Sequence, residues 1–92
     1  MTQLKSLVIC LIMLGMVGSS LACTMICGDY WVGVVIHVHP DLYSTSNGGL
    51  FKDQCFRYTG HHTSHQGYTW KEIHYGSDLG WVASEYTYSK AC

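Results

Sequence analysis

The segment from Gly67 to Tyr86 constrains the fold more than any other part of this 92-residue chain. Residues 68–75 are rich in Tyr, Trp, Thr and Ile, which favour the pleated, half-buried surface of a β-strand. Gly76-Ser77-Asp78 is typical of a turn. Residues 79–83 form a second apolar run, in which Gly80 leaves room for another backbone to approach. We therefore predict an antiparallel hairpin within a small all-β domain.

Other apolar segments predict further strands. Residues 31–38, WVGVVIHV, place four aliphatic side chains on one face at a period of two, and Pro40 ends this strand. Residues 50–59 form the next strand. Residues 87–91 form the last one, which we expect to close on the N-terminal strand.

The connections are polar. We predict long loops at residues 41–49 and 60–66, where Gly, Ser and Asn or His predominate, and a helical turn at residues 85–86. Five or six short antiparallel strands joined in this way suit a small barrel, which removes exposed strand edges.

The N-terminus is typical of a secretory signal peptide. Lys5 supplies a positive charge, residues 7–17 are apolar apart from one glycine, and Ser20-Leu21-Ala22 places small residues at the cleavage positions. The apolar run is shorter than the ~20 residues that a membrane span needs. We expect residues 1–22 to be removed, leaving residues 23–92 as one secreted domain. A retained anchor and an acylated Cys23 are the alternatives.

Four cysteines remain in the mature chain: Cys23, Cys27, Cys55 and Cys92. An even number in a short secreted domain predicts two disulfides, with three possible connectivities. A domain of this size usually needs such bonds because its core is small. Zinc binding is the alternative, but Cys23 and Cys27 have no matching second pair.

The charge excludes several classes of function. The whole chain has a formal net charge of −1, and loss of Lys5 with the signal peptide makes it −2. Without a basic patch, the chain lacks the electrostatic term that dominates nucleic-acid binding, and it does not resemble a membrane-lytic peptide. We expect neither a nucleic-acid partner nor a membrane partner after signal removal.

The C-terminal pattern Tyr-x-Trp-x-x-Ile-x-Tyr, a turn, then Gly-Trp-Val-x-Ser-x-Tyr resembles bacterial-type SH3-like (SH3b) domains. It is carried by Trp70, Ile73, Gly80, Trp81, Val82 and Tyr86. Residues 34–40 match the family's first strand in their apolar positions and in the proline, but not in its Asn, Arg, Ser and Gly. The resemblance covers residues 34–86 and implies a small SH3-like barrel, here a secreted, disulfide-stapled variant.

The resemblance also implies a ligand site. Family members that bind peptidoglycan hold it in a groove lined by aromatic residues between loops, so the two long loops here would flank one groove. Tyrosine offers rigid contact area with a polar tip. The expected ligand-binding residues are Tyr43, Asn47, Tyr58, His61 and Tyr68. In such a barrel the termini lie close, which favours pairing of Cys92 with Cys23 or Cys27. Trp70 and Trp81 are expected in the core.

Catalysis is not expected. With the cysteines oxidised there is no thiolate nucleophile, and no motif of a hydrolase, metalloprotease or phosphate-binding loop occurs. We predict a non-catalytic module without cofactor or metal that binds bacterial cell-wall peptidoglycan or its peptide stem, in a role such as host defence. The alternatives are a toxin-like effector that acts on a protein surface and a metal binder that uses the six histidines.

Overall fold

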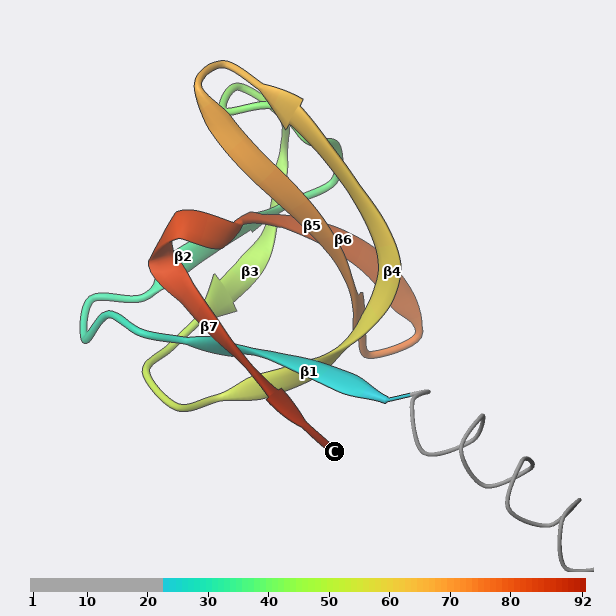
Figure 1. Cartoon of the computed structure of the whole chain (residues 1–92). Coiled ribbons are helices and arrows are strands. Elements are labelled where there is room, and N and C mark those ends of the chain that lie inside the picture. Colours follow the sequence, from blue (N-terminus) through green and yellow to red (C-terminus); the bar gives the residue numbers. More distant parts are fainter. Residues whose placement is uncertain (1–22) are drawn as a thin grey trace, which may run out of the picture.

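The computed structural model describes residues 23–92, which form one curled, antiparallel sheet of seven strands, a half-barrel (Figure 1). The order across the sheet is β3-β2-β6-β5-β4-β1-β7. The elements in chain order are β1 (Thr24–Gly28), β2 (Val34–His37), β3 (Ser46–Leu50), β4 (Cys55–His65), β5 (Tyr68–Tyr75), β6 (Asp78–Ala83), the 3-10 helix η1 (Ser84–Tyr86) and β7 (Thr87–Ala91).

The all-β class is confirmed, with one strand more than the five or six expected. The predicted signal peptide lies outside the described residues. Within residues 23–92, no helix has the length and apolar character required to cross a membrane.

The predicted hairpin is present as β5 and β6. These strands pair from Tyr75 opposite Asp78 to Trp70 opposite Ala83. Gly80 is buried, and a β-carbon at this position would overlap the Cγ2 methyl of Ile36 in β2. The expectation that Gly80 admits a neighbouring chain is therefore confirmed, and the chain that approaches is β2.

The predicted loop at residues 60–66 is wrong, because β4 continues through it to His65. Its polar residues pair with β5, and the connection shrinks to Gln66 and Gly67, which both have positive φ, 56° and 82°. Two such residues form the type I′ turn whose twist matches a hairpin. A register shift between Tyr58 and His62 accompanies the positive φ of Gly60, 98°.

Three other strand predictions also need correction. Residues 46–50 were expected in a loop but form β3, an edge strand paired with β2. The expected strand at residues 50–59 is divided, because a turn at residues 51–54 separates β3 from β4. The expected strand at residues 31–38 is reduced to β2.

The strand that receives β7 is β1, which the sequence pattern did not indicate. The edges β3 and β7 have no outer strand neighbour in the described sheet, so the barrel is half-formed rather than edge-free. The curl nevertheless brings Gly28, at the end of β1, against Lys52, just after β3, as an isolated bridge.

Two disulfides fasten the N-terminal strand. Cys27 and Cys55 lie directly opposite each other in β1 and β4 and are bonded, and Cys23 is bonded to Cys92. The expected two disulfides, and the pairing of Cys92 with one of the first two cysteines, are confirmed. Two disulfides in a small domain are consistent with an extracellular protein.

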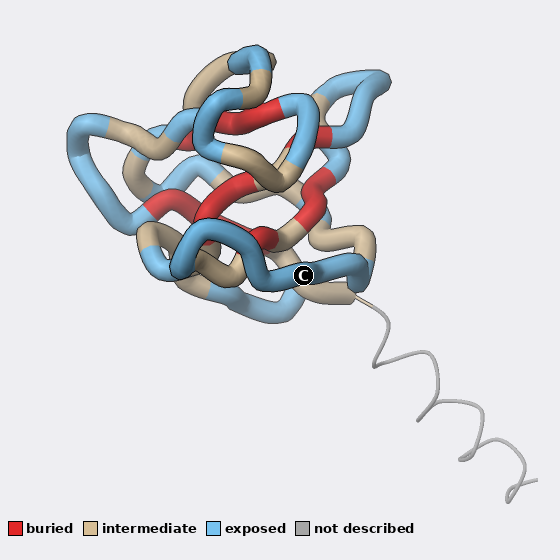
Figure 2. Tube along the Cα trace, turned by 90° about the horizontal axis from the view of Figure 1, so that it is seen from above, coloured by how far each residue is buried: buried red, intermediate tan, exposed pale blue. Residues whose placement is uncertain are grey.

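The core is a cluster of five aliphatic residues inside the curl, drawn from five different strands (Figure 2). The cluster consists of Ile26, Ile36, Leu50, Ile73 and Val82. Trp70 is also buried, as expected, whereas Trp81 is only half-buried.

Candidate functional site

A groove of about 270 Å³ lies where β2 and the loop before it meet β5 and η1. We call it the aromatic groove, and its walls include Tyr30, Val32, Leu42, Tyr68, Trp70 and Tyr86. It is open to solvent at the tyrosines and closed at the buried Trp70. Its volume is close to the lower limit of ~300–1,000 Å³ typical of small-molecule sites, so it suits a single side chain or sugar ring.

Aromatic rings follow one another along this groove at steep angles. Tyr30 and Tyr86 meet edge to face, with centroids 5.1 Å apart and planes at 85°. Tyr68 contacts both Tyr86, at 5.9 Å, and Trp70, at 6.2 Å. His37 meets Trp70 at 5.5 Å with planes at 82°. Rings that meet edge to face stabilise one another, and none of these four pairs is stacked in parallel.

Local interactions hold this aromatic row in place. The hydroxyls of Tyr68 and Tyr86 are 3.3 Å apart, and this hydrogen bond, with the nearby charges of Tyr68 and Glu85, raises the pKa of Tyr86. Both carboxylate oxygens of Glu85 accept the Thr69 N–H, at 3.1 and 3.0 Å. The short helix η1 is therefore fixed to β5, which sets the position of Tyr86.

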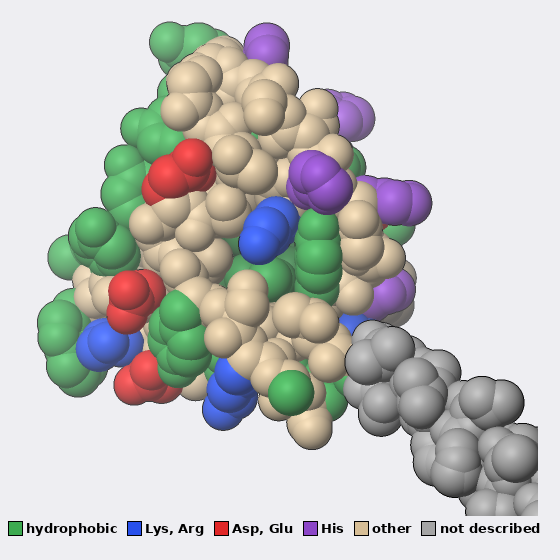
Figure 3. All heavy atoms as spheres, viewed as in Figure 1, with side chains coloured by type: hydrophobic (Ala, Val, Ile, Leu, Met, Phe, Trp, Pro, Cys, Tyr) green, Lys and Arg blue, Asp and Glu red, His purple; other side chains and the backbone are tan. Residues whose placement is uncertain are grey.

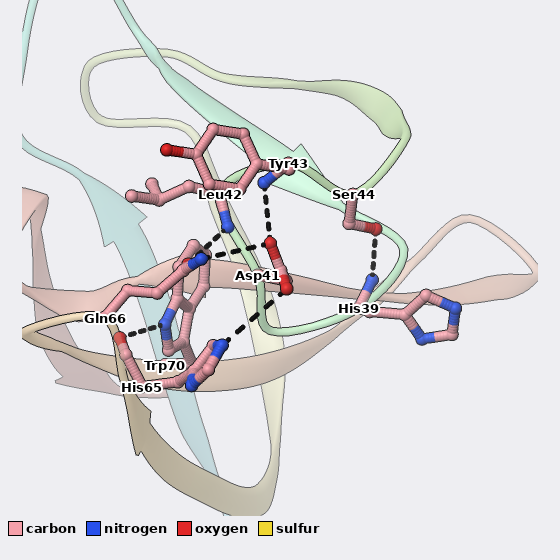
Figure 4. A network of polar contacts seen from close by, with 8 residues as sticks. All are labelled: His39, Asp41, Leu42, Tyr43, Ser44, His65, Gln66 and Trp70. Carbon is pink, nitrogen blue, oxygen red and sulfur yellow. Dashed lines mark hydrogen bonds and ion pairs between the residues drawn. The ribbon is translucent and has the colours of Figure 1, made fainter.

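The tip of the β4–β5 hairpin is tied to the loop that follows β2 (Figure 4). Gln66 Oε1 accepts the Leu42 N–H at 2.7 Å, and Gln66 Nε2 donates to Asp41 Oδ1 at 3.3 Å. His65 Nε2 is 3.6 Å from Asp41 Oδ2, and the His65 carbonyl accepts the Trp70 indole N–H at 3.0 Å. We call these contacts the hairpin latch. Because Leu42 lies in the groove wall, the latch positions that wall.

The Asp41 carboxylate is the hub of the hairpin latch. The Tyr43 N–H donates to its Oδ1 at 2.8 Å, and this bond lowers the pKa of Asp41, with smaller contributions in the same direction from Gln66 and His65. His39 is joined to the same loop through its N–H, which donates to the Ser44 hydroxyl. Its ring points away from the other residues drawn in Figure 4.

The residues expected to bind a ligand are not gathered in one place. Tyr68 lies in the aromatic groove. Tyr43 is 88% exposed and borders a shallower hollow with His39, Asp41 and Ser44. The two predicted loop regions do meet, through the hairpin latch, but only Tyr68 of the expected set lines the main groove.

The other three expected residues have structural contacts. Asn47 Nδ2 donates to the Leu79 carbonyl and so joins β3 to β6. Tyr58 packs against the core, lies under Lys71 and has a raised pKa because it is partly desolvated. His61 Nδ1 donates to the Glu72 carboxylate at 3.1 Å.

Glu72 is a buried carboxylate, with 8% of its surface exposed. It accepts hydrogen bonds from the Thr59 hydroxyl and from His61, both in β4, so its contacts join β4 to β5. Residues 23–92 bring no three His, Cys, Asp or Glu side chains together as metal ligands. In Figure 3 the histidines lie along one flank, over β4 and the top of the molecule.

Sequence reasoning missed Tyr30, Leu42 and His37 as groove residues and took Tyr86 only as part of a family pattern. The contact between Tyr30 and Tyr86 joins residues at opposite ends of the described chain, so no local spacing indicates it. His37 in β2 is buried beside Trp70 in β5, a contact between two strands that no local spacing indicates. The sequence feature that indicated an aromatic site was the large number of tyrosines.

Exposed apolar side chains extend outward from the groove. Trp31 and Val32, in the loop before β2, are 82% and 85% exposed. Figure 3 shows the hydrophobic side chains along the flank opposite the histidines. The set of exposed large apolar residues is completed by Tyr30, Val35, Val38, Leu42, Tyr43, Phe51 and Leu79. Of these residues, Tyr30, Val32, Val35 and Leu42 line the groove, and exposed apolar surface of this kind at a groove is typical of an interaction site.

Comparison of the chain with protein-family models, with curated proteins and with solved structures found no match.

Proposed function

We propose that this protein is a secreted, non-catalytic binding module whose ligand occupies the aromatic groove. The observation that carries the proposal is the row of Tyr30, Tyr86, Tyr68 and Trp70 along a groove of about 270 Å³. Aromatic faces offer contact area at a low cost in conformational entropy, and the hydroxyls of the three tyrosines supply polar contacts at the rim.

The proposed ligand is bacterial cell-wall peptidoglycan, bound through its peptide stem, in a defensive role. The support for this choice is the resemblance of residues 34–86 to bacterial-type SH3-like domains. Trp70 and Tyr86, two of the residues that carry this resemblance, line the groove. The two disulfides and the signal-like residues 1–22 support a secreted protein.

Co-sedimentation with insoluble peptidoglycan tests this function. The protein should sediment with peptidoglycan and not with cellulose, at pH values from about 5 to 8, the range in which histidine changes its charge. Tyr68→Ala should weaken sedimentation, whereas Tyr43→Ala should not, because Tyr43 is exposed and lies outside the groove. Circular dichroism checks that both variants keep the fold. If the parent protein does not sediment with peptidoglycan at any pH in this range, the proposal that peptidoglycan is the ligand is wrong.

A second candidate is an effector that binds a protein surface. The exposed Trp31 favours it, because this side chain is not part of the groove wall and a peptidoglycan strand in the groove would leave it in water. Trp31→Ser should therefore leave wall binding unchanged under the first proposal. If peptidoglycan binding is absent and Trp31→Ser makes the protein more soluble, the protein-binding function is preferred.

A further inference from the structure

The aromatic groove is lined by Tyr and Trp rings, which bind cations through their faces. Within the described part of the chain, no Lys or Arg is among the residues that line it. The faces of Tyr and Trp rings attract ammonium and guanidinium groups within about 6 Å, most strongly when water is excluded. Three tyrosines and one tryptophan line this one small volume, and the planes of neighbouring rings meet at 85°, 43° and 68°.

Elsewhere in the molecule, aromatic faces are already covered by the chain's own cations. Lys52 Nζ lies 5.5 Å from the Trp31 ring centroid, and Lys71 Nζ lies 5.5 Å from that of Tyr58. Two of the four Lys and Arg residues after position 22 are used in this way. The aromatic groove differs from these two places because its rings have no such intramolecular partner within residues 23–92.

Negative charge lies beside the groove walls. Glu85 precedes the groove residue Tyr86, and its charge contributes to the raised pKa of that tyrosine. Asp41 precedes the groove residue Leu42. The other titratable groups near this region are Asp29, which is paired with Lys52 at 3.5 Å, and the imidazole of His65, 3.6 Å from Asp41. Glu85 forms no ion pair within residues 23–92.

We propose that the aromatic groove binds one peptide side chain that ends in an ammonium group, with its alkyl stem on Val32 and Leu42 and its charged end against the tyrosine faces near Glu85. The apolar walls match the stem, and the rings and the carboxylate match the charge. The inference rests on the proposed function, because it names the part of the ligand that is bound. In a peptidoglycan stem, the diamino acid carries such an amine.

The test compares two small probes by NMR of the mature protein. N-acetyl-lysine methylamide carries the ammonium, whereas N-acetyl-norleucine methylamide keeps the four side-chain carbons and lacks it. N-acetyl-lysine methylamide should shift the aromatic signals of Tyr30, Tyr68 and Tyr86 and bind at least about five-fold more tightly than the norleucine probe. Equal binding of the two probes, or no binding of the lysine probe up to its solubility, overturns the inference.

Two variants distinguish the contribution of the aromatic rings to binding from that of the negative charge. Tyr30→Leu keeps apolar bulk but removes a ring, and Glu85→Gln removes the charge while its amide oxygen still accepts the Thr69 N–H. Each should reduce the preference for lysine over norleucine by about two- to five-fold, whereas Tyr43→Leu should not change it. A preference unchanged in both variants also overturns the inference.

The outcomes distinguish the two proposals. If the lysine probe binds but peptidoglycan does not sediment the protein, the cation site stands and the wall ligand is wrong. If peptidoglycan binding depends on Tyr68 but the probes bind equally, the function stands and the cation site is wrong.

Discussion

The hydroxyl of Tyr68 lies 3.3 Å from that of Tyr86, and both residues line the aromatic groove. Tyr68 begins β5 and Tyr86 ends η1, so the bond joins residues 18 positions apart. It is also the principal reason that the pKa of Tyr86 is raised. The pKa of Tyr86 therefore reports whether the two hydroxyls are hydrogen-bonded, as the geometry of the groove requires.

Tyr68→Phe should lower the pKa of Tyr86 towards the ordinary tyrosine value of about 10. A pKa raised in the folded state means that the proton is held more tightly when folded. The resulting stability is complete below the unfolded-state pKa and is lost as the pH rises through the folded-state pKa. The parent should therefore melt at lower temperature above about pH 10, and Tyr68→Phe should show a smaller fall.

Carbon NMR of the tyrosine ζ-carbons follows the titration of Tyr86 directly. Tyr88→Phe is the matched control. The pKa of Tyr88 is also raised, by its hydrogen bond to Asp53, but Tyr88 lies in β7 outside the groove. That variant should leave the titration of Tyr86 unchanged. An unaltered pKa of Tyr86 in Tyr68→Phe would show that the two hydroxyls are not bonded in solution.

The two disulfides should differ in what their loss costs. Their sequence separations of 28 and 69 residues predict an entropic stabilisation of about 3.5 kcal/mol for Cys27–Cys55 and about 4.5 kcal/mol for Cys23–Cys92. Cys27 is fully buried, so its replacement by alanine also removes core contacts. We expect the pair Cys27→Ala and Cys55→Ala to be the more damaging, with a domain largely unfolded at 37 °C.

Thermal melts followed by circular dichroism measure this difference. At roughly 4–8 °C per kcal/mol for a domain of this size, each loss should lower the melting temperature by about 15–35 °C. If removal of Cys23–Cys92 lowers it more, the length of the closed loop decides the outcome and packing at Cys27 adds little.

The strands that the sequence predicted are those whose residue preferences agree with their pairing. The β5–β6 hairpin has aromatic and β-branched residues on both sides of a Gly-Ser turn, so local preference and tertiary pairing coincide. Residues 46–50, SNGGL, have a composition that favours a turn, and they become β3 only because β2 offers hydrogen-bonding partners. Residues 61–65 are exposed and polar, and only β5 makes them a strand.

The residues of the aromatic groove were likewise predicted only where local sequence features indicate them. Tyr68 was predicted because it borders the expected loop at residues 60–66, which in the structure is reduced to the turn at Gln66 and Gly67. Tyr30 and Tyr86 meet only after β7 has paired with β1 and η1 has docked on β5, contacts that no local period specifies. Tyr58 looked equivalent to Tyr68 in the sequence, but the register of β4 places it against the core.

Gly80→Ala should destabilise the domain by about 1–3 kcal/mol, because the added methyl would overlap the Cγ2 of Ile36 in a packed core. Leu79→Ala is the control at the neighbouring exposed position, where a truncation should cost less than about 1 kcal/mol. Chemical denaturation of the two variants measures both values. Equal stability of Gly80→Ala and the parent would mean that β2 does not approach β6 as closely as the structure has it.

Gln66→Asn should open the hairpin latch without harming the hairpin. Asn before Gly67 suits the type I′ turn, in which residue 66 has a φ of 56°. The shorter side chain, however, no longer reaches both the Leu42 N–H and Asp41, which Gln66 contacts at 2.7 and 3.3 Å. The loss of a hydrogen bond worth about 1 kcal/mol should speed hydrogen exchange of the Leu42 amide about five-fold.

The Val38 amide, which donates to the Thr45 carbonyl in the same connection, is the internal control and should keep its exchange rate. Because Leu42 forms part of the groove wall, the variant should also bind the proposed groove ligand more weakly than the parent, with an unchanged circular-dichroism spectrum. Unchanged exchange at Leu42 would show that the Gln66 side chain does not hold this loop. Faster exchange at both amides would show that the whole connection, and not the latch alone, depends on residue 66.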